Sequence, residues 1–455
     1  MDNQTAPKPY KAHFKATLVL GLPIIGSLLA QTAIGTTDTI MVGWYGVDEL
    51  AAVVLATSIY FVFFIVGSGF AMAVMPMVAS YEGAGDVKQV RRVVRMGLWI
   101  SVIYSAALMP FLWFFEDLMI AIGQKPEIAA LAQDYMRIAQ WGMFPAMLIM
   151  VLKSYLSALE RPAWVLWGTI LGAIANGLAN YALIFGNWGA PEMGVAGAAI
   201  ASVVTASITF LVLAFYAQYQ RVLREYAVFT RIWRSDWPAF IEVFRLGWPI
   251  GATMLAEVGL FSMSAIMMGW LGTRELATHG IVLQIASMSF MIYLGLANVG
   301  TIRTGHALGR RDKLGIWRAS VTVAALQLVI AVVLIAVMVL LPKQLIGLFL
   351  DRSNPQSPDI IAYGTGLLMV AAAFQIVDGM QVIALSVLRG IKDTKIPMLF
   401  AMLSYWGVGI PTSYILGFKL GFGGYGVWGG LVIGLALAAV TMLSRFFWQM
   451  RRLSF

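Results

Sequence analysis

The sequence predicts an all-α integral membrane protein with twelve transmembrane helices in two six-helix lobes related by an internal repeat. The 455 residues are 60% hydrophobic and only 12% charged, which is far outside the usage of soluble proteins. The chain contains twelve apolar runs that are each long enough to cross a bilayer, which takes about 20 helical residues. It also matches itself when it is shifted by 226 residues.

The apolar runs are the predicted spans. Those of the first half lie near residues 16–42, 50–79, 93–115, 131–159, 163–186 and 194–218. Those of the second half lie near residues 240–270, 276–302, 318–342, 359–388, 397–417 and 424–449. The length of the runs and the lack of strict alternation favour helices over a barrel. The first run is too long for a cleavable signal peptide, so we interpret it as a retained span.

The basic residues predict the orientation of the spans. Most Lys and Arg lie in the termini and the even-numbered connections, whereas the odd-numbered connections hold only Lys125, Arg274, Lys343, Arg352 and Lys419. Since cytoplasmic loops are enriched in Lys and Arg, both termini should be cytoplasmic. The net charge of +9 is scattered over short connections without a continuous basic face. We therefore expect no nucleic-acid partner.

The longest inner connection divides the chain near its middle. We expect a cytoplasmic tail over residues 1–15, an N-lobe over 16–218, a cytoplasmic linker over 219–240, a C-lobe over 241–449 and a cytoplasmic tail over 450–455. The chain contains no cysteine, which excludes disulfides and cysteine-based metal or catalytic sites.

The internal repeat carries its motifs in one register. Gly-x-Pro occurs at positions 21 and 247, Met-x-Gly-Trp-x-Gly at 41 and 267, and Glu-Leu-Ala at 49 and 275, while Asp86 matches Asp312. Single matches of Leu, Gly or Ala arise by chance, but several motifs at one offset indicate a duplication. A six-span unit repeated once keeps its orientation, so an axis along the membrane normal should relate the lobes.

Three acidic residues lie at the depth of predicted spans: Asp38 in the first, Glu257 in the seventh and Asp378 in the tenth. None has a Lys or Arg within one helical turn of its own span. Because an ionisable group in lipid costs about 3 kcal/mol, each acid should be protonated, bind a cation or find a partner on another helix. The alternative is that each acid has a structural role and stabilises helix packing through hydrogen bonds to amide or backbone groups.

Polar amides accompany these acids. Asn176 and Asn180 are four residues apart, so they share one face of the fifth span. They are either ligands in an ion network or polar groups that pack helices together. The same two interpretations apply to Gln31, Gln284, Gln375, Gln381 and Ser202. The 26 Met and 25 Phe residues would suit a cavity for flat, apolar, cationic ligands.

Three segments resemble the multidrug and toxic compound extrusion (MATE) family, in its bacterial NorM-like branch. They are QTAIGTTDTIMVGWYGVDELAA from residue 31, GWPIGATMLAE from residue 247 and, most specifically, LSVLRGIKDTKIPM from residue 385. The resemblance covers nearly the whole chain. It implies a V-shaped molecule of two six-helix lobes that exports drugs in exchange for Na⁺ or H⁺.

The resemblance also implies roles for individual residues. Asp38, Asn176 and Asn180 would bind the coupling cation in the N-lobe and respond to the drug. Glu257 and Asp378 would coordinate the cation, including Na⁺ as a bound metal ion, and Tyr293 would offer it a ring face. The chain carries Phe374 one turn before Asp378, where some relatives have Tyr, so no hydroxyl is expected there.

We therefore expect a monomeric secondary antiporter in the bacterial inner membrane. Its partners would be amphipathic cationic compounds, the coupling cation and the lipid bilayer, with no cofactor beyond Na⁺ or H⁺. The sequence does not distinguish these two ions. The alternative is a flippase for lipid-linked precursors, but flippases usually line their cavity with Arg or Lys, and the basic residues within the spans are only Arg137, Lys153 and Arg245. A membrane-embedded enzyme would need a nucleophile, a metal motif or paired carboxylates on one helical face. The sequence shows none of these, so we do not expect an enzyme.

Overall fold

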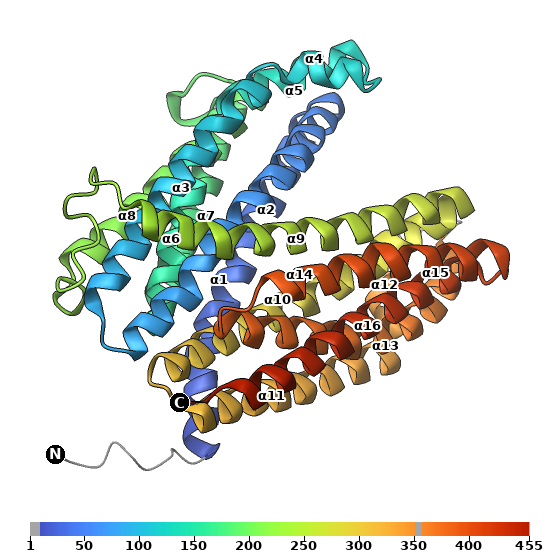
Figure 1. Ribbon diagram of the computed structural model, residues 1–455. Coiled ribbons are helices and arrows are strands. Elements are labelled where there is room, and N and C mark those ends of the chain that lie inside the picture. The colour runs from blue at the N-terminus through green and yellow to red at the C-terminus, as the bar shows by residue number, and fades with distance from the viewer. Residues whose placement is uncertain (1–9, 351–356, 455) are drawn as a thin grey trace. The chain divides into compact units, whose positions relative to one another are not determined.

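The computed structural model describes residues 10–350 and 357–454, which form helices joined by connections, the longest of them between α8 and α9 (Figure 1). These ranges contain no strand. Within them, twelve helices are long and apolar enough to cross a membrane, so the predicted all-α class with twelve spans is confirmed. Arg352 of the predicted outer connections lies outside the described residues, as do residues 1–9 and 455 of the predicted tails.

Packing divides the chain into two compact units. The N-unit comprises Leu22–Gly251, and the C-unit comprises the residues up to Gly21 together with those from Ala252 onward. Both boundaries fall inside a helix, since α1 spans Tyr10–Tyr45 and α9 spans Trp237–Leu271. The first turns of α1 therefore belong to the C-unit, and the first turns of α9 belong to the N-unit.

The N-unit is built from the helices between these two boundaries. They are α2 (Val47–Gly83), α3 (Val87–Trp113), α4 (Phe115–Ala121), α5 (Pro126–Ala139), α6 (Met143–Ala158), α7 (Pro162–Phe185) and α8 (Gly194–Tyr219). A 3₁₀ turn over Gln140–Gly142 joins α5 to α6, and the two helices form one span. Helix α2 packs against α3, α5 and α6, while α7 packs along α8.

Two glycines allow close packing of α7 on α8. Gly168 and Gly172 lie one turn apart, and a Cβ on Gly168 would lie 3.1 Å from the side chain of Leu213 in α8. A Cβ on Gly172 would press on Thr209 of the same helix at 2.5 Å. This spacing is typical of helices that approach closely in membranes. Asn176 and Asn180 continue the buried stripe of α7, so this packing positions both amides.

The C-unit is organised around one central helix, α13. Its members are α10 (Thr273–Gly309), α11 (Lys313–Leu340), α12 (Pro342–Gly347), α13 (Ser357–Gly390), α14 (Lys395–Met402), α15 (Ile410–Tyr414) and α16 (Gly423–Arg452). Helix α13 packs against α10, α11 and α16. The start of α1 is also held in this unit, because Arg303 of α10 donates to the backbone oxygen of His13 at 2.6 Å.

The eleventh span, Lys395–Lys419, is irregular. Between α14 and α15 the chain is wound as a π-helix over Leu403–Gly409, and a second π-helical stretch covers Ile415–Lys419. Pro411 lacks the N–H that an α-helix would need at this point, so regular winding is interrupted. A π-helical turn contains an extra residue and changes the direction of the side chains around it.

The predicted repeat is visible where two helices begin. Asp86 caps α3 by accepting a hydrogen bond from the backbone N–H of Gln89 at 3.1 Å. Asp312, its counterpart in the repeat, caps α11 by accepting one from the backbone N–H of Gly315 at 2.7 Å. A side chain that accepts from the third residue of a helix satisfies a backbone donor that the helix itself leaves free.

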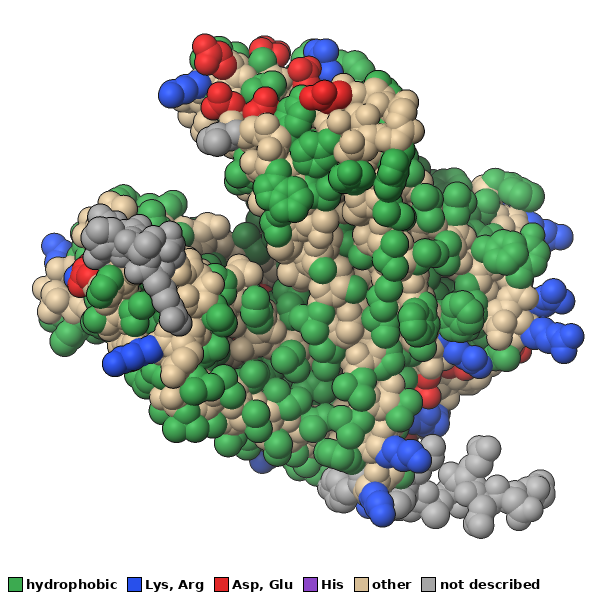
Figure 2. Space-filling view, turned by 180° about the vertical axis from the view of Figure 1, so that it is seen from behind, with side chains coloured by type: hydrophobic (Ala, Val, Ile, Leu, Met, Phe, Trp, Pro, Cys, Tyr) green, Lys and Arg blue, Asp and Glu red, His purple; other side chains and the backbone are tan. Residues whose placement is uncertain are grey.

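Hydrophobic side chains cover the flanks of the helices (Figure 2). On α7, for example, Leu171, Ile174 and Leu178 are between 49% and 58% exposed. Apolar surface of this extent would promote aggregation in water but is satisfied by lipid. The predicted multi-pass membrane protein is therefore confirmed.

Candidate functional site

In the N-unit, donors from two other helices hold the carboxylate of Asp38. Asn180 Nδ2 of α7 donates to Oδ1 of Asp38 at 2.5 Å, and Ser202 Oγ of α8 donates to Oδ2 at 3.4 Å. The amide of Asn180 also donates to Oδ1 of Asn176 at 3.3 Å. The structure therefore brings together all three predicted N-lobe site residues and adds Ser202 to them.

This cluster retains hydrogen-bonding capacity. Asn176 and Asn180 are fully buried. Within the described part of the chain, Oδ1 of Asn180 has no hydrogen-bond partner. A buried polar atom without a partner costs about 1–3 kcal/mol, so the cluster can gain from one more polar ligand. Tyr135 of α5 lies close enough to interact electrostatically with Asp38.

A second polar contact involves the same helix α1, two helical turns before Asp38. Lys153 Nζ of α6 donates to Oε1 of Gln31 at 2.9 Å. The sequence identified Lys153 only as a basic residue within a span. Its acceptor depends on how α6 is rotated toward α1, and no sequence pattern reports that rotation.

In the C-unit, two carboxylates interact. Asp378 of α13 is only 2% exposed, Glu257 of α9 is half-buried, and the two interact electrostatically. Oδ1 of Asp378 and Oε1 of Glu257 have no hydrogen-bond partner in the residues that the structure describes. Two negative charges in a poorly solvated site repel each other, so a proton or a cation at this pair would be stabilising.

One basic side chain acts on this pair. Arg389, near the end of α13, interacts electrostatically with Glu257. It belongs to the LSVLRGIKDTKIPM segment, but it was not among the site residues expected from the sequence. One cation facing two carboxylates leaves the acids with an excess negative charge.

Two buried tyrosines lie beside the acids. Tyr293 of α10, one of the site residues that the family resemblance implies, interacts electrostatically with Asp378. Tyr405, in the π-helical stretch of the eleventh span, interacts with both Glu257 and Asp378. Neither hydroxyl has a hydrogen-bond partner among the described residues. The sequence reading missed Tyr405, although Pro411 and its neighbouring glycines could have indicated an irregular helix there.

Three glutamines complete the polar lining. Gln375 and Gln381 lie three residues before and after Asp378 on α13, and Gln327 of α11 lies against Gly379, where a Cβ would collide with its amide. All three are fully buried, and their amide atoms have no partners within residues 10–350 and 357–454. Gln375 and Gln381 were candidates from the sequence, whereas Gln327 was not.

Aromatic rings form a wall next to these polar groups. Phe374 makes edge-to-face contacts with Phe261, at a centroid distance of 6.0 Å, and with Trp428, at 5.4 Å. As expected from its side chain, Phe374 contributes a ring and no hydroxyl. Rings packed in this way exclude water, which strengthens the electrostatic interactions of the neighbouring acids.

The C-unit site offers oxygen donors for a small hard cation. Its charged ligands would be Glu257 and Asp378, and its neutral ones the oxygens of the tyrosines and glutamines. Oxygen sites of this kind suit hard cations rather than transition metals. The described ranges contain no group of three or more His, Cys, Asp or Glu that could hold a metal ion. The residues present fit Na⁺ or a proton equally well.

Comparison with known proteins gives a family match over most of the chain. A family model described as MatE matches residues 23–182 and 249–415. The chain is 48% identical over 445 residues to the "Probable multidrug resistance protein NorM" of Rhizobium meliloti, covering 98% of this chain and 95% of that protein. It is 44% identical over 441 residues to the protein of the same name from Agrobacterium fabrum, covering 97% and 95%.

The fold is also similar to solved structures. The structure described as "Crystal structure of MATE in complex with MaL6" superposes with a TM-score of 0.88 over 98% of this chain and 99% of that chain, at 21% sequence identity.

Proposed function

The chain belongs to the MatE family, whose members are transporters rather than enzymes, and from this premise we propose that it exports amphipathic cationic compounds in exchange for Na⁺ or H⁺. The family resemblance predicted from the sequence is thereby confirmed. The observation that carries the proposed exchange is the pair of Glu257 and Asp378, whose unpartnered oxygens lie inside a lipid-embedded helical unit.

Coupling follows from the electrostatics of this pair. With a proton or Na⁺ bound, the excess negative charge is cancelled, and without it the carboxylates repel each other. The two states therefore favour different arrangements of α9, α13 and the eleventh span. An ion gradient shifts the equilibrium between these arrangements because the ion binds one of them more tightly than the other.

The substrate class is supported by chemistry and by the relatives. The relatives from Rhizobium meliloti and Agrobacterium fabrum are both named as probable multidrug resistance proteins. In this chain the acids lie beside aromatic rings such as Phe374, and a carboxylate next to ring faces suits a flat organic cation. Asp38 and its amides form a second acidic cluster that can respond to such a cation.

We further propose that the protein acts as a monomer in the bacterial inner membrane, with both termini cytoplasmic. The bias of Lys and Arg toward the even-numbered connections supports this orientation. A cysteine introduced at Ser235 should react with a thiol reagent only when the reagent reaches the cytoplasm. Labelling from the periplasm would contradict the proposed span count, and the absence of native cysteine keeps the background low.

The decisive experiment is transport in proteoliposomes with each gradient imposed alone. The purified protein is reconstituted, a fluorescent organic cation such as ethidium is supplied, and either a Na⁺ gradient or a pH gradient is applied at zero membrane potential. We expect one gradient by itself to drive movement of the dye against the ion flux, which identifies the coupling ion. Dye movement that neither gradient changes would contradict antiport.

A further inference from the structure

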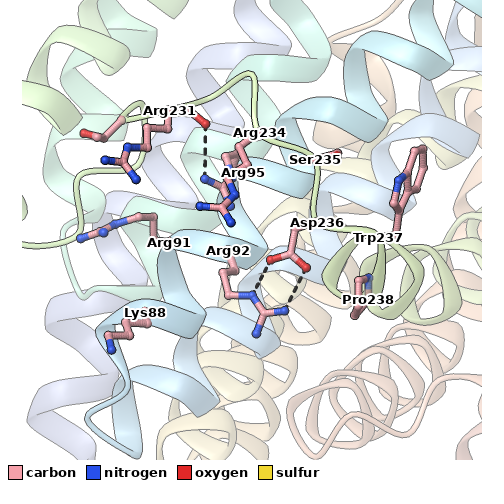
Figure 3. A pocket seen from close by; sticks show the side chains of 11 residues that line it. Lys88, Arg91, Arg92, Arg95, Arg231, Arg234, Ser235, Asp236, Trp237 and Pro238 are labelled. Carbon is pink, nitrogen blue, oxygen red and sulfur yellow. Dashed lines mark hydrogen bonds and ion pairs between the residues drawn. The ribbon is translucent and has the colours of Figure 1, made fainter.

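A basic pocket of about 800 Å³ lies in the N-unit where α3 and α9 begin (Figure 3). Helix α3 contributes Lys88, Arg91, Arg92 and Arg95, and the linker before α9 contributes Arg231 and Arg234. Asp236 is the only acidic residue among those that line it. Basic residues on the cytoplasmic side favour the predicted orientation of the spans wherever they lie on that side. The orientation of the spans therefore does not explain why these six surround one pocket.

Only one of the six cations is neutralised by a carboxylate lining the pocket. Arg92 Nε contacts Oδ2 of Asp236 at 2.5 Å, and its Nη2 donates to Oδ1 at 2.9 Å. The hydrogen bond from Arg92 holds the pKa of Asp236 below its ordinary value, so this carboxylate stays charged. Figure 3 shows that the dashed contacts of Asp236 reach Arg92 alone. Five positive charges therefore remain around the pocket.

Backbone carbonyls orient two of the remaining guanidinium groups. Arg91 donates to the carbonyls of Tyr226 and Glu225, the latter at 2.8 Å. Arg95 Nη1 donates to the carbonyl of Arg231 at 3.3 Å. A carbonyl fixes the position of a guanidinium without cancelling its charge, so these groups are already ordered for an anionic ligand.

Arg95 gives the strongest indication that the pocket accepts an anion. Its side chain is buried, with 8% of the residue exposed, and its Nε has no hydrogen-bond partner in the part of the chain that the structure describes. The negative charge of Asp236 acts on it favourably, and the positive charges of the neighbouring arginines act on it unfavourably. A buried guanidinium that has an unpaired N–H and several arginines nearby is stabilised when an anion binds beside it.

We propose that this pocket binds the phosphate of an acidic phospholipid from the adjacent membrane leaflet. Guanidinium groups match phosphate oxygens with paired N–H donors, and basic pockets at the cytoplasmic ends of transmembrane helices suit anionic headgroups.

The position of the pocket favours a lipid over a soluble phosphate. The candidate membrane-spanning helices α3 and α9 begin at Val87 and Trp237, so the pocket lies at one end of both helices, where lipid headgroups would be within reach. Trp237 lines the pocket and is 58% exposed, and Trp233 in the linker is 76% exposed. In Figure 3, Trp237 and Pro238 form an apolar edge at the end away from Lys88. Exposed tryptophans at helix ends are typical of the membrane interface.

Two pairs of substitutions with the same charge change test the proposal. Arg231→Gln with Arg234→Gln removes two exposed cations that line the pocket, and Arg221→Gln with Arg224→Gln removes two exposed cations of the same linker that do not. Because all four side chains are exposed, both double variants should fold, which size-exclusion chromatography and thermal unfolding check. Binding of dioleoyl phosphatidylglycerol to the full-length protein in detergent is then measured by native mass spectrometry.

We expect the pocket pair to weaken phosphatidylglycerol binding by about tenfold or more and the control pair by less than about threefold. Dioleoyl phosphatidylcholine should bind the unmodified protein at least about tenfold more weakly than phosphatidylglycerol. Equal weakening by the two pairs would mean general surface attraction and would overturn the proposal. Equal affinity for the two lipids would overturn it as well.

A competition arm separates the lipid from a soluble phosphate. Soluble glycerol 3-phosphate carries the same phosphate chemistry without acyl chains. We expect a hundredfold excess of it over phosphatidylglycerol to leave lipid binding unchanged, because the apolar edge contributes to affinity only for the lipid. Displacement of the lipid at equal concentration would assign the pocket to a soluble phosphate instead.

Discussion

The N-unit and the C-unit each contain acidic side chains within membrane spans, but the groups that stabilise these acids differ between the two units. Asp38 receives hydrogen bonds from Asn180 and Ser202, so its charge is spread over donors that the protein itself supplies. Glu257 and Asp378 lie near each other, and each retains an oxygen without a partner in the described residues. The N-unit acid therefore has donors within the protein, whereas the C-unit pair retains oxygens that a proton or cation could satisfy.

The repeat makes this contrast sharper. In the register of 226 residues, Gln31 corresponds to Glu257, and Asp38 corresponds to Ser264. Each half thus has one acid on its first helix, but the two acids lie two turns apart in the aligned helices. Each half also has a basic side chain beside the residue at the Gln31/Glu257 position of the repeat. Lys153 contacts Gln31, and Arg389 interacts with Glu257. Duplication preserved the scaffold, and the two copies diverged in ionic chemistry.

The largest effect is expected from Asp378→Asn. This change removes the charge of the more deeply buried member of the pair, and under the proposed coupling the C-unit then loses one of the two acids that bind the proton or Na⁺. We expect gradient-driven efflux to fall about a hundredfold or more at unchanged abundance in the membrane. The measurement is the initial efflux rate at matched expression. Asp359→Asn, an exposed position on the same helix, is the control and should retain its rate; wild-type efflux by Asp378→Asn would refute the ionic role of the pair.

Glu257→Gln should have the next largest effect. It leaves Asp378 as a single acid and removes the charge that faces Arg389. We expect at least about a tenfold loss of efflux and a weaker apparent affinity for the coupling ion, because one of its two charged ligands is gone. Efflux is measured against the concentration of the driving ion. An unchanged ion dependence would place Glu257 outside the coupling site.

Asp38→Asn tests whether the two sites act separately. The amide can keep a contact with Asn180, so the fold should persist while the charge that responds to the drug is lost. We expect about a tenfold loss of efflux with ion binding in the C-unit retained. Calorimetric titration of the driving ion into the purified variant distinguishes these effects. If ion binding is lost together with efflux, the contrast between the two units is wrong.

Asn180→Ala and Ser202→Ala measure how much each hydrogen bond to Asp38 contributes to the stability of the N-unit. Asn180 donates at 2.5 Å and Ser202 at 3.4 Å, so the first deletion removes the stronger hydrogen bond. We expect Asn180→Ala to lower the free energy of unfolding by about 1–3 kcal/mol and Ser202→Ala by less than about 1 kcal/mol. Chemical denaturation in detergent gives both values, and a larger effect at Ser202 would contradict this order.

The smallest effects are expected where the two halves share their chemistry. Asp86→Ala and Asp312→Ala remove equivalent caps from α3 and α11. Each should destabilise the protein by about 1 kcal/mol, and the two values should agree within experimental error. Differential thermal unfolding of the two variants provides the comparison. A clear inequality would indicate that the halves differ in local packing as well as in their ionic sites.

The candidate site was only partly predictable from the sequence. Asp38, Glu257 and Asp378 were found because a charge within a long apolar run is conspicuous, and Asn176 with Asn180 because their spacing places them on one helical face. Tyr405 and Gln327 were missed, since a Tyr or Gln in a span is common and has many uses. The π-helical winding around Tyr405 and the space beside Gly379 give these two residues their place, and neither is a property of the residue itself.

The sequence by itself determined the membrane class, the twelve spans, the repeat and the acids, because hydrophobicity, length and register are local properties of the chain. The tertiary structure alone decided which groups face one another: Lys153 with Gln31, Arg389 with Glu257, and the linker arginines with those of α3. Such pairs depend on how each helix is rotated and how deeply it is placed against its neighbours. In lipid, small packing residues such as Gly172 and irregular turns such as Leu403–Gly409 set these rotations, because apolar side chains facing lipid favour no particular one.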